Sequence, residues 1–530
     1  MLKFAWDDMG GPREIELKLE LEASDAERLR ELPFLRRRSG RAKQHLRSVY
    51  FDTPKRVLGK AGVSLRIRTV KGRHLQTLKA SDGAAAGLFD RQEWEHEVAR
   101  PEPDLAAATN TTIGGIVRRR AVRKNLRPVF ETIVERTVRR ISRDGAQIEL
   151  ALDEGEVRAG PDSAPLCSLE LELKKGPVEA LFAVARSCNE AVPLRLEVVS
   201  KSERGYALLE GRRTRVAKAE PVQLDRDMSA AEGFQAIMRS CIRHFRLNEP
   251  VLLDARETEA LHQARIAIRR LRSALSLFKD MIADGAVDDL KDRLRTFSRE
   301  LGDARNLDVF LADILAPGDE DSGGEPGATS LLAYAKARRE AAYDRVVATM
   351  VSQDFRQLML DLAAWTEHGP WISSEDSLNK GLRERLLADL AIELLDAWRR
   401  KVKNKGRNLK RLDPAKRHRT RIAAKKLRYA SEFVAQLYDT RKLSKRHQAF
   451  VEALQELQTQ LGELNDIVAG ERLAETLAHD AARAASGAGD GEAAFSAGLA
   501  AGKLDKDVDT LLDGAAKAHA QFVAAEPFWR

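Results

Sequence analysis

The sequence predicts an α+β chain of more than one domain, in which a closed β-sheet with a charged interior precedes an all-α domain. Two observations support this prediction. In many short segments before about residue 205, apolar and polar side chains alternate with a period of two, which is the pattern of β-strands. From about residue 227 onward the apolar residues lie three and four apart, in segments rich in Ala, Leu, Arg and Glu, which is typical of helices with one buried face.

Length and composition narrow the class of protein. A chain of 530 residues exceeds what one hydrophobic core supports, so about two to four domains are expected. The net charge of +9 favours a polyanionic partner. Three scattered cysteines without metal-binding spacing fit buried thiols in a reducing compartment. No apolar run reaches the roughly 18 residues of a membrane span and no signal pattern opens the chain, so we expect a cytoplasmic protein without a membrane partner.

The first predicted strand covers residues 13–22. Its even positions from 14 to 22 are charged, and its odd positions from 15 to 21 are aliphatic. Turn signals rich in Gly, Pro and Asp separate several further segments of similar pattern. These segments predict strands at 63–70, 74–79, 91–98, 131–140, 146–153, 166–174 and 194–200, with one helix at 178–189.

Acidic and basic side chains share the faces of these strands. Glu14, Glu16 and Lys18 lie on one face of the first strand, and the same order of two acids and a base recurs within residues 170–174. A solvated outer face with weak salt bridges explains any one strand taken alone. Six strands of this kind are harder to explain in that way, because their aliphatic faces must also be buried. We therefore predict a closed sheet whose interior carries both signs of charge.

A mixed interior of this kind suits a phosphate chain with a divalent metal ion. Carboxylates two residues apart on adjacent strands offer the oxygen ligands that Mg²⁺ and Mn²⁺ prefer. Lys and Arg side chains would bind the remaining phosphate oxygens, with bidentate contacts from Arg. An interior of a single charge sign would repel itself when empty, and the mixed lining avoids this.

The helical half contains an internal repeat, which predicts a pseudo-twofold pair of helical bundles. A second echo follows each copy of the repeat, as LGDARN at 301–306 and LGELND at 461–466. The repeated basic pattern reads His262-x-x-Arg265-x-x-x-Arg269-Arg270-x-Arg272 in the first copy and His418-x-x-Arg421-x-x-x-Lys425-Lys426-x-Arg428 in the second.

Composition also sets the expected domain boundaries. The strand-rich domain covers 12–210, a linker follows at 211–226, and the helical domain covers 227–530. Within the helical domain we expect repeats at about 227–315 and 330–480, an acidic Gly/Pro linker at 316–329 and a loose Gly/Ala-rich segment at 484–502.

The two basic helical faces predict a polyanion site. Residues 399–428 hold fifteen Lys or Arg and a single acid, Asp413. A lone basic helix is most often a solubilising face, but here two copies agree in position. Like charges at helical spacing repel each other by a few tenths of a kcal/mol per pair, so a bound polyanion is the better explanation. Aromatic residues are sparse around Tyr429, which argues against stacking on single-stranded nucleic acid.

The strand-rich half contains an ordered set of motifs: Glu14-x-Glu16-x-Lys18, Arg47 followed by Tyr50-Phe51-Asp52-Thr53, Leu65-Arg66-Ile67-Arg68, Lys79, Glu93-x-Glu95, Arg136, Asp153, Glu170-x-Glu172 and Lys201-Ser202-x-Arg204-Gly205-Tyr206. In this set it resembles the CYTH superfamily, the triphosphate tunnel metalloenzymes. The helical half resembles the CHAD domain in its paired basic helices, and the tandem order is similar to that of bacterial CYTH–CHAD inorganic triphosphatases.

The resemblance implies an eight-stranded antiparallel β-barrel tunnel that hydrolyses inorganic triphosphate to diphosphate and phosphate with Mg²⁺ or Mn²⁺. No residue stands out as a general base. By position, the implied metal ligands are Glu14, Glu16, Glu170, Glu172, Glu93, Glu95 and Asp153. The implied triphosphate contacts are Lys18, Arg66, Arg68, Lys79, Arg136, Lys201 and Arg204. For the helical half the resemblance implies inorganic polyphosphate, bound by His262, Arg265, Arg269, Arg270, Arg272, His418, Arg421, Lys425, Lys426 and Arg428.

Several alternatives stay open at this point. The same tunnel would accept a nucleoside triphosphate, thiamine triphosphate or 5′-triphosphate RNA, or would cyclise a nucleotide to a cyclic adenylate. A base-stacking aromatic side chain near the entrance would favour the nucleotides. The rival from another class is a non-catalytic polyphosphate-binding scaffold, although clustered carboxylates bring no advantage to a protein that only binds anions.

Overall fold

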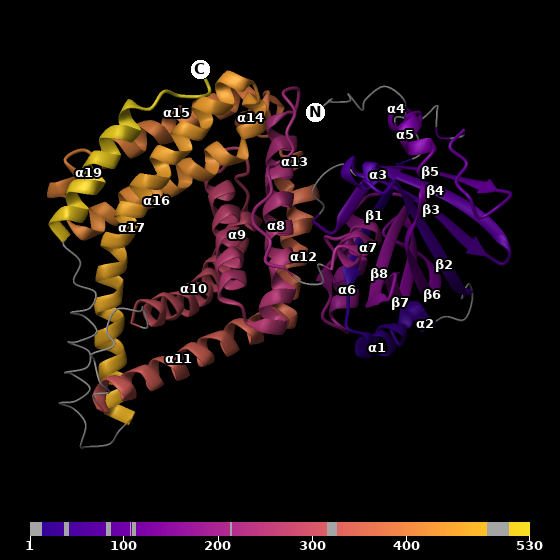
Figure 1. Cartoon of the computed structure of the whole chain (residues 1–530), viewed down its shortest axis with the longest axis horizontal. Coiled ribbons are helices and arrows are strands. Elements are labelled where there is room, and N and C mark those ends of the chain that lie inside the picture. Colours follow the sequence, from indigo (N-terminus) through magenta and orange to yellow (C-terminus); the bar gives the residue numbers. More distant parts are fainter. Residues whose placement is uncertain are drawn as a thin grey trace. The chain divides into compact units, whose positions relative to one another are not determined.

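The N-terminal part of the chain is a closed antiparallel barrel of eight strands (Figure 1), as the sequence predicts. The computed structural model describes residues 13–36, 42–80, 86–106, 108, 113–211, 215–314, 326–484 and 508–530. Strand β1 pairs with β8 on one side and with β5 on the other, which closes the order β1-β5-β4-β3-β2-β6-β7-β8. The strands are β1 Arg13–Glu20, β2 Ala42–Asp52, β3 Val63–Val70, β4 Arg73–Ala80, β5 Leu88–Val98, β6 Arg127–Arg143, β7 Ala146–Ala159 and β8 Asp162–Lys175.

Two strand assignments from the sequence need correction. The predicted strand at 194–200 is wrong, because only β9, Arg195–Leu196, pairs with the end of β1 before the chain turns into a helix. Strand β2 was not predicted from the alternation. Its Tyr50 faces the barrel interior and stacks on Phe130, while its Phe51 packs in the outer core. Because this part of β2 is apolar on both faces, the alternation disappears from the sequence.

Separate apolar cores cover the two surfaces of the barrel wall. Outside β2, β3 and β4, a core that includes Leu65, Ile67 and Leu78 packs against side chains of the segment between β5 and β6. That segment holds the short helices α4, Gly114–Val117, and α5, Arg120–Arg123. A second core, which includes Phe130 and Leu208, packs helix α7, Lys201–Leu209, against β6, β7 and β8. The polar part of the interior is therefore bordered by an apolar layer.

From residue 230 the described chain is helical, as predicted. Within the described ranges, no helix combines the length and hydropathy that crossing a membrane requires. The predicted linker at 316–329 and loose segment at 484–502 fall largely outside the described residues, although helix α11 already begins at Pro326. The helices are α8 Ala230–Ala255, α9 Thr258–Leu277, α10 Gly285–Ile314, α11 Pro326–Val351, α12 Gln353–His368, α13 Pro370–Ser373, α14 Ser377–Glu384, α15 Leu387–Lys405, α16 Pro414–Phe433, α17 Arg441–Ala484 and α19 Val508–Ala524. The barrel part adds α1 Ala26–Arg30, α2 Pro33–Arg36, α3 Val57–Lys60 and α6 Glu179–Asn189.

The internal repeat of the sequence is also a repeat of the structure. Helices α9 and α16, which carry the two basic patterns, each have 20 residues, and both ends of α16 lie 156 residues after those of α9. The following long helices, α10 and α17, carry the second echo. The two copies therefore use the same helix boundaries for the same sequence pattern.

One helix from the C-terminal half of the chain packs with the barrel. The chain divides into two compact units, of which the first contains residues 1–216 together with 350–369. Helix α12 lies in this second stretch and packs against α6. Arg186 donates to Asp361 over 2.9 Å, and the ring of Phe182 lies 5.1 Å from that of His368.

A buried carboxylate joins two of the sequence motifs in the barrel unit. Asp52 ends β2 and accepts hydrogen bonds from the backbone N–H groups of Thr53, Leu58 and Gly59, over 2.6 to 3.0 Å. The hydroxyl of Tyr206 donates to the same carboxylate over 2.7 Å. Position 59 has to be glycine, because a Cβ there would lie 2.7 Å from the Tyr206 ring. Asp52 therefore fixes α3 and α7 to the same end of the wall.

Asp52→Ala is expected to lower the free energy of unfolding of the barrel unit by about 3 kcal/mol or more, since each buried donor left unpaired costs about 1–3 kcal/mol. Tyr206→Phe removes one hydrogen bond and is expected to cost only about 1 kcal/mol. Urea unfolding of the full chain, followed by circular dichroism, measures both changes. Equal losses in the two variants would contradict the assignment of Asp52 as the shared acceptor.

Candidate functional site: a charged cavity in the barrel and a basic surface on the repeated helices

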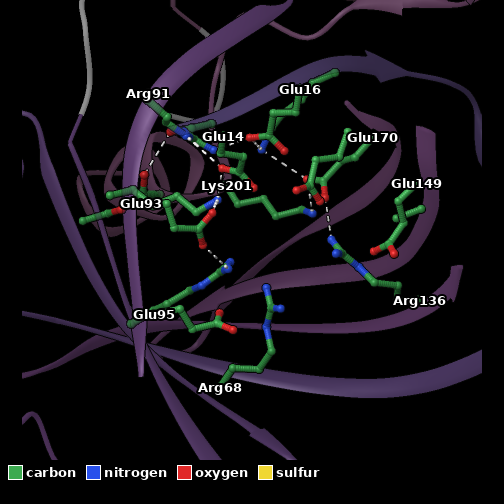
Figure 2. Close-up of a pocket in the computed structure, with 18 of the residues that line it drawn as sticks. Glu14, Glu16, Arg68, Arg91, Glu93, Glu95, Arg136, Glu149, Glu170 and Lys201 are labelled. Atoms are coloured by element: carbon green, nitrogen blue, oxygen red, sulfur yellow. Dashed lines mark hydrogen bonds and ion pairs between the residues drawn. The ribbon is translucent and has the colours of Figure 1, made fainter. Parts of the chain in front are cut away.

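The barrel interior contains a cavity of about 470 Å³ lined mostly by charged side chains (Figure 2). They come from strands all round the barrel and from the start of α7. The only aromatic lining residue among those described is Tyr50, which is 4% exposed. The lining includes seven acids, Glu14, Glu16, Glu93, Glu95, Glu149, Glu170 and Glu172, and nine bases, Arg13, Lys18, Arg66, Arg68, Lys79, Arg91, Arg136, Lys174 and Lys201.

Three of the acids face one another across neighbouring strands. Glu149 on β7 pairs in register with Glu172 on β8, which pairs in turn with Glu16 on β1. Side chains directly opposite each other lie about 4.5–5.5 Å apart at Cβ, and like charges in this position are destabilising. Burial, together with Glu14 and Glu149, raises the pKa of Glu172 despite its contact with Lys174. Each acid of this row also contacts a base: Lys18 and Arg91 for Glu16, Arg140 for Glu149, and Lys174 for Glu172. These contacts do not bring the pKa of Glu172 down to its usual value.

The next row along the same strands is neutralised by lysine and arginine. Glu170 accepts from Lys18 over 3.2 Å and from Lys201 over 2.8 Å, and Arg136 also donates to it. Burial alone would raise the pKa of Glu170, but these three cations hold it well below the usual value. Burial would likewise lower the pKa of Lys18, and the carboxylates of Glu16 and Glu170 raise it instead. Both groups are therefore charged across the physiological range.

Arg91 on β5 lies between the acids of the first strand. It pairs in register with Glu14, and its guanidinium contacts Glu16 as well as Glu14, the latter over 3.5 Å. Its Cζ also lies 5.1 Å from the centre of the Phe89 ring. Lys79 contacts Glu14 on the same side of the cavity. The two acids that open the first strand are thus held by two basic side chains from β4 and β5.

Positive charge is in excess around Arg68 on the opposite wall, whereas Arg136 is paired with Asp153 and Glu170. Burial, Arg66 and Arg136 lower the pKa of Arg68 to about 10. Arg66 hydrogen-bonds the Tyr50 hydroxyl and lies 4.0 Å from Glu93. Burial would raise the pKa of Tyr50, but Arg66 and Lys201 lower it. A neighbouring anion would relieve the repulsion among these cations, so this wall is suited to bind phosphate oxygens.

Twelve of the fourteen barrel residues singled out in the sequence line this one cavity. Asp153 and Arg204 are the exceptions. Asp153 is fully buried behind the lining, where it accepts from Lys201 and, over 2.7 Å, from Arg136. Arg204 points to Glu197 over 3.2 Å and to Glu20. Both side chains thus serve ion pairs outside the cavity, and direct contact with a ligand in it is not their role in this geometry.

Nine further residues line the cavity without having been singled out in the sequence: Arg91, Glu149, Arg13, Tyr50, Ser64, Ala151, Lys174, Ser200 and Ser202. A signal existed for the first two. Arg91 lies two residues before Glu93 on a predicted strand, so it shares the face of Glu93 and Glu95. Glu149 shares the face of Asp153 in the same way. The lining contributed by Ser200 and Ser202 depends on how the chain enters α7, which the alternation does not reveal.

The acidic row fits a divalent cation in its donor chemistry. Carboxylate oxygens on adjacent strands are the ligands that Mg²⁺ and Mn²⁺ prefer, and such an ion would relieve the repulsion between the opposed acids. Among the described residues, no group of three or more Asp, Glu, His or Cys side chains is already arranged to hold a metal ion. Lys174 and Arg91 contact Glu172 and Glu16, so a metal ion here would replace these contacts.

In the helical half, the two basic helices bring four cations together. Burial and the charges of Arg421, Arg269 and Arg265 lower the pKa of Lys425 to about 6. Burial, Arg269 and Arg421 lower the pKa of Arg265 to about 10. The nearest counter-charge is Asp466 on α17, 3.8 Å from Arg421. We call Arg265, Arg269, Arg421 and Lys425 the four-cation cluster.

The second echo of the repeat makes room for this cluster. A Cβ added at Gly302 would lie 3.7 Å from the guanidinium of Arg265, and one at Gly462 would lie 3.5 Å from that of Arg421. The two glycines therefore hold equivalent places beside the equivalent arginines. Because glycine has no side chain, the guanidinium of Arg265 can lie close to the backbone of α10, and that of Arg421 close to the backbone of α17.

The other basic residues of the pattern are engaged elsewhere. The two histidines of the pattern differ in environment. His418 is exposed and contacts Asn465 over 2.6 Å. His262 is partly buried, and burial together with Arg305 lowers its pKa. Arg270 and Arg428 both contact Glu432, over 3.2 and 2.8 Å. Lys426 contacts Ser276, and Arg272 contacts Ser298. The pattern thus divides between the four-cation cluster and a set of contacts within the fold.

Comparison with known proteins agrees with this description. The CYTH domain family matches residues 12–206, and the CHAD domain family matches residues 236–475. A curated relative, the inorganic triphosphatase of Haemophilus influenzae, is 30% identical over 164 residues, which is 31% of this chain and 46% of the relative. The chain therefore spans about half the length of that relative.

Solved structures of similar proteins come from both halves. The CHAD domain from the plant Ricinus communis is 29% identical, covering 57% of this chain and 96% of that one, with a TM-score of 0.47. A candidate adenylyl cyclase from Hippeastrum, reported to have a dominant triphosphatase activity, is 22% identical, covering 37% of this chain and 95% of that one, with a TM-score of 0.26. These scores are too low to add to the domain assignment. The family matches carry it: the chain contains a CYTH domain, residues 12–206, followed by a CHAD domain, residues 236–475.

Proposed function

We propose that the barrel hydrolyses inorganic triphosphate to diphosphate and phosphate with the help of Mg²⁺ or Mn²⁺. The observation that carries this proposal is a contrast within the cavity. Three opposed acids lie on one side, where the pKa of Glu172 stays raised, and a basic wall lies on the other, where the pKa of Arg68 is lowered. A metal–triphosphate complex would bring positive charge to the acids and negative charge to the basic wall. The inorganic triphosphatase of H. influenzae, similar over 164 residues, supports the same reading.

The lining favours inorganic triphosphate over nucleotides. A nucleotide or thiamine moiety gains affinity from an exposed aromatic surface, and Tyr50, the one aromatic lining residue described, is buried against Phe130. The scaffold alternative, in which the tunnel only grips chain ends, leaves the row of Glu16, Glu149 and Glu172 without a purpose. The cytoplasmic location expected from the sequence remains a prediction.

Each group of side chains has a distinct task in the proposed reaction. Arg66 and Arg68 would hold the phosphate oxygens on one wall, with bidentate contacts that fix the chain in line. Arg136 would add to them only in exchange for its hydrogen bonds to Asp153 and Glu170. Lys18 and Lys201 are fixed by Glu170 and would carry positive charge to the transferred phosphoryl group. Glu16 and Glu172, with Glu14 and Glu149 beside them, would hold the metal ion. The ion would neutralise charge on the phosphoryl oxygens as the bond breaks.

We further propose that the helical half binds inorganic polyphosphate at the four-cation cluster. The cluster joins basic side chains from both copies of the repeat, with the single acid Asp466 among the charges that act on Lys425. A polyanion would restore the charge that burial and repulsion remove from Lys425. Polyphosphate fits better than nucleic acid, because the cluster has cations without a stacking surface.

Glu16→Gln and Glu172→Gln should each lower the rate of triphosphate hydrolysis by about 100-fold or more, the upper end of the loss caused by disturbing a metal ligand's support. Both should also weaken Mn²⁺ binding measured by calorimetry without substrate. Glu135→Gln, an exposed change on β6, is the matched control. Wild-type rates and Mn²⁺ affinity in both cavity variants would remove the metal-site assignment.

Arg66→Ala should reduce kcat/KM for triphosphate by about 10- to 100-fold, because a charge-assisted contact contributes about 1.5–3 kcal/mol. Arg66→Lys restores the charge but not the bidentate geometry, and should recover only part of the loss. Arg47→Ala, at an exposed arginine of β2, controls for lost charge alone. If the Ala and Lys variants at position 66 both match wild type, Arg66 does not contact the substrate.

Reversing the four-cation cluster to Glu should abolish polyphosphate binding by the full chain, and wild-type affinity should fall steeply with salt, by analogy with nucleic acids. The full chain is used because α12 belongs with the barrel unit. A control variant reverses four exposed lysines of the same half, Lys279, Lys336, Lys380 and Lys445. Equal loss in both variants would mean that a diffuse positive field, and not the cluster, binds the polyanion.

A further inference from the structure

The two repeated helices exchange reciprocal contacts across their interface. Arg270 of α9 contacts Glu432 of α16 over 3.2 Å, and Lys426 of α16 contacts Ser276 of α9 over 2.8 Å. Lys426 lies 156 residues after Arg270, and Glu432 lies 156 residues after Ser276, which is the offset of the repeat. The two contacts are therefore the same contact seen from the two sides of a local twofold axis.

Only one side of this axis has an acid. The carboxylate of Glu432 neutralises Arg270 and also accepts from Arg428 over 2.8 Å. Ser276 holds the equivalent place with a neutral hydroxyl. Lys426 and Arg272, the counterparts of Arg270 and Arg428, are thus left without the carboxylate that their symmetry mates share.

Further cations gather around this second side. The charged groups that act on Lys426 are Lys401 of α15 and Arg272, and burial with these two lowers the pKa of Lys426. The charged groups that act on Arg272 are Arg295 and Arg299 of α10, and burial with these two lowers the pKa of Arg272. Among the described residues, neither side chain has an ion pair with an acid. Lys426, which contacts Ser276, and Arg272, one helical turn before it, thus have basic neighbours, of which Arg295 is itself paired with Asp292 over 2.9 Å.

An aromatic ring lies beneath the two lysines, and the hydroxyl of Ser276 can still donate a hydrogen bond. Lys401 and Lys426 lie over the ring of Trp398, 4.3 and 5.2 Å from its centre. The hydroxyl oxygen of Ser276 accepts from Lys426, which leaves the hydroxyl proton to donate to another group. Arg272 is positioned by a 3.2 Å hydrogen bond to Ser298.

We propose that this Ser276 cluster, formed by Arg272, Ser276, Lys401 and Lys426, is a second anion site that binds a phosphate group of a polyphosphate chain. An oxygen of that phosphate takes the place that the Glu432 carboxylate occupies on the other side of the axis. The choice of polyphosphate rests on the proposed function of the helical half. A phosphate group offers several oxygens to converging N–H and O–H donors, which a single carboxylate cannot match.

The site makes the two halves of the helical domain inequivalent toward a polyanion. A chain seated on the four-cation cluster reaches further cations on the Ser276 side and an acid on the Glu432 side. Binding is therefore directional along the pair of helices, although the repeat itself is nearly symmetric.

The test restores the missing acid. In the full chain, Ser276→Glu is expected to pair with Lys426 and Arg272, to raise the Tm in buffer without anions, and to weaken long-chain polyphosphate binding about tenfold with a salt slope smaller by about 1. Ser276→Gln has nearly the same size without the charge and should keep the wild-type affinity and slope. The mirror change Glu432→Ser should create a second site of this kind and tighten polyphosphate binding.

The outcomes separate this site from the proposed function. Wild-type affinity and slope in Ser276→Glu overturn the site, while loss of binding on reversal of the four-cation cluster still supports polyphosphate binding as such. Equal weakening by Ser276→Gln overturns it too, because the effect is then steric. If the wild-type chain binds no polyphosphate at any salt concentration, both proposals fail. Inorganic monophosphate serves as a further probe: a Tm increase that Ser276→Glu abolishes supports the site with free phosphate as its ligand.

Discussion

The barrel depends on the balance of opposed charges within its interior. Closing the sheet places Glu149, Glu172 and Glu16 next to one another on three successive strands, an arrangement that is unfavourable unless positive charge lies nearby. One row further along, the same strands carry Glu170 among three cations, and there the charges are satisfied within the chain. The two rows differ in the result: the pKa of Glu172 in the first row stays raised, while that of Glu170 in the second is held well below its usual value.

The apolar shell makes this balance possible. The outer faces of β2, β3 and β4 are buried by the segment that includes α4 and α5, and α7 packs on an apolar layer at one end of the interior. With both surfaces of the wall occupied, the ionic side chains are confined to one cavity. In such a setting, partial removal of water strengthens each remaining electrostatic contact. The same confinement explains why so many pKa values in the lining depart from their usual range.

Much of this arrangement was predictable from the sequence, for an identifiable reason. Wherever one face of a strand is apolar and the other ionic, the period of two places the side chains correctly, as for Glu14, Glu16 and Lys18. The prediction failed where that contrast is lost. Strand β2 is apolar on both faces around Tyr50 and Phe51. The segment at 194–200 carries the alternation, but only Arg195 and Leu196 pair with a neighbouring strand before the chain turns into α7.

The sequence also does not show which acidic and basic side chains form ion pairs with each other. Asp153 and Arg204 stand in the family motifs beside residues that line the cavity, yet the fold turns both toward ion pairs outside it. Period and motif give the face on which a side chain lies, but its depth along the barrel depends on strand register and stagger. In the helical half, likewise, the pattern gives ten basic residues. Only the packing of α9 on α16 shows that four of them form the four-cation cluster, whereas Arg270 and Arg428 share the carboxylate of Glu432.

The position of α12 has a consequence for the synthesis of this protein. The first compact unit ends at residue 216 and is completed only by residues 350–369, so the surface of α6 that receives α12 stays uncovered while the intervening 133 residues are made. At about 5–20 residues per second, that interval lasts roughly 7–27 s. During this time Phe182, on α6, lacks its partner His368 on the incoming helix. The barrel unit can therefore be completed only after a helix in the middle of the following domain has been synthesised.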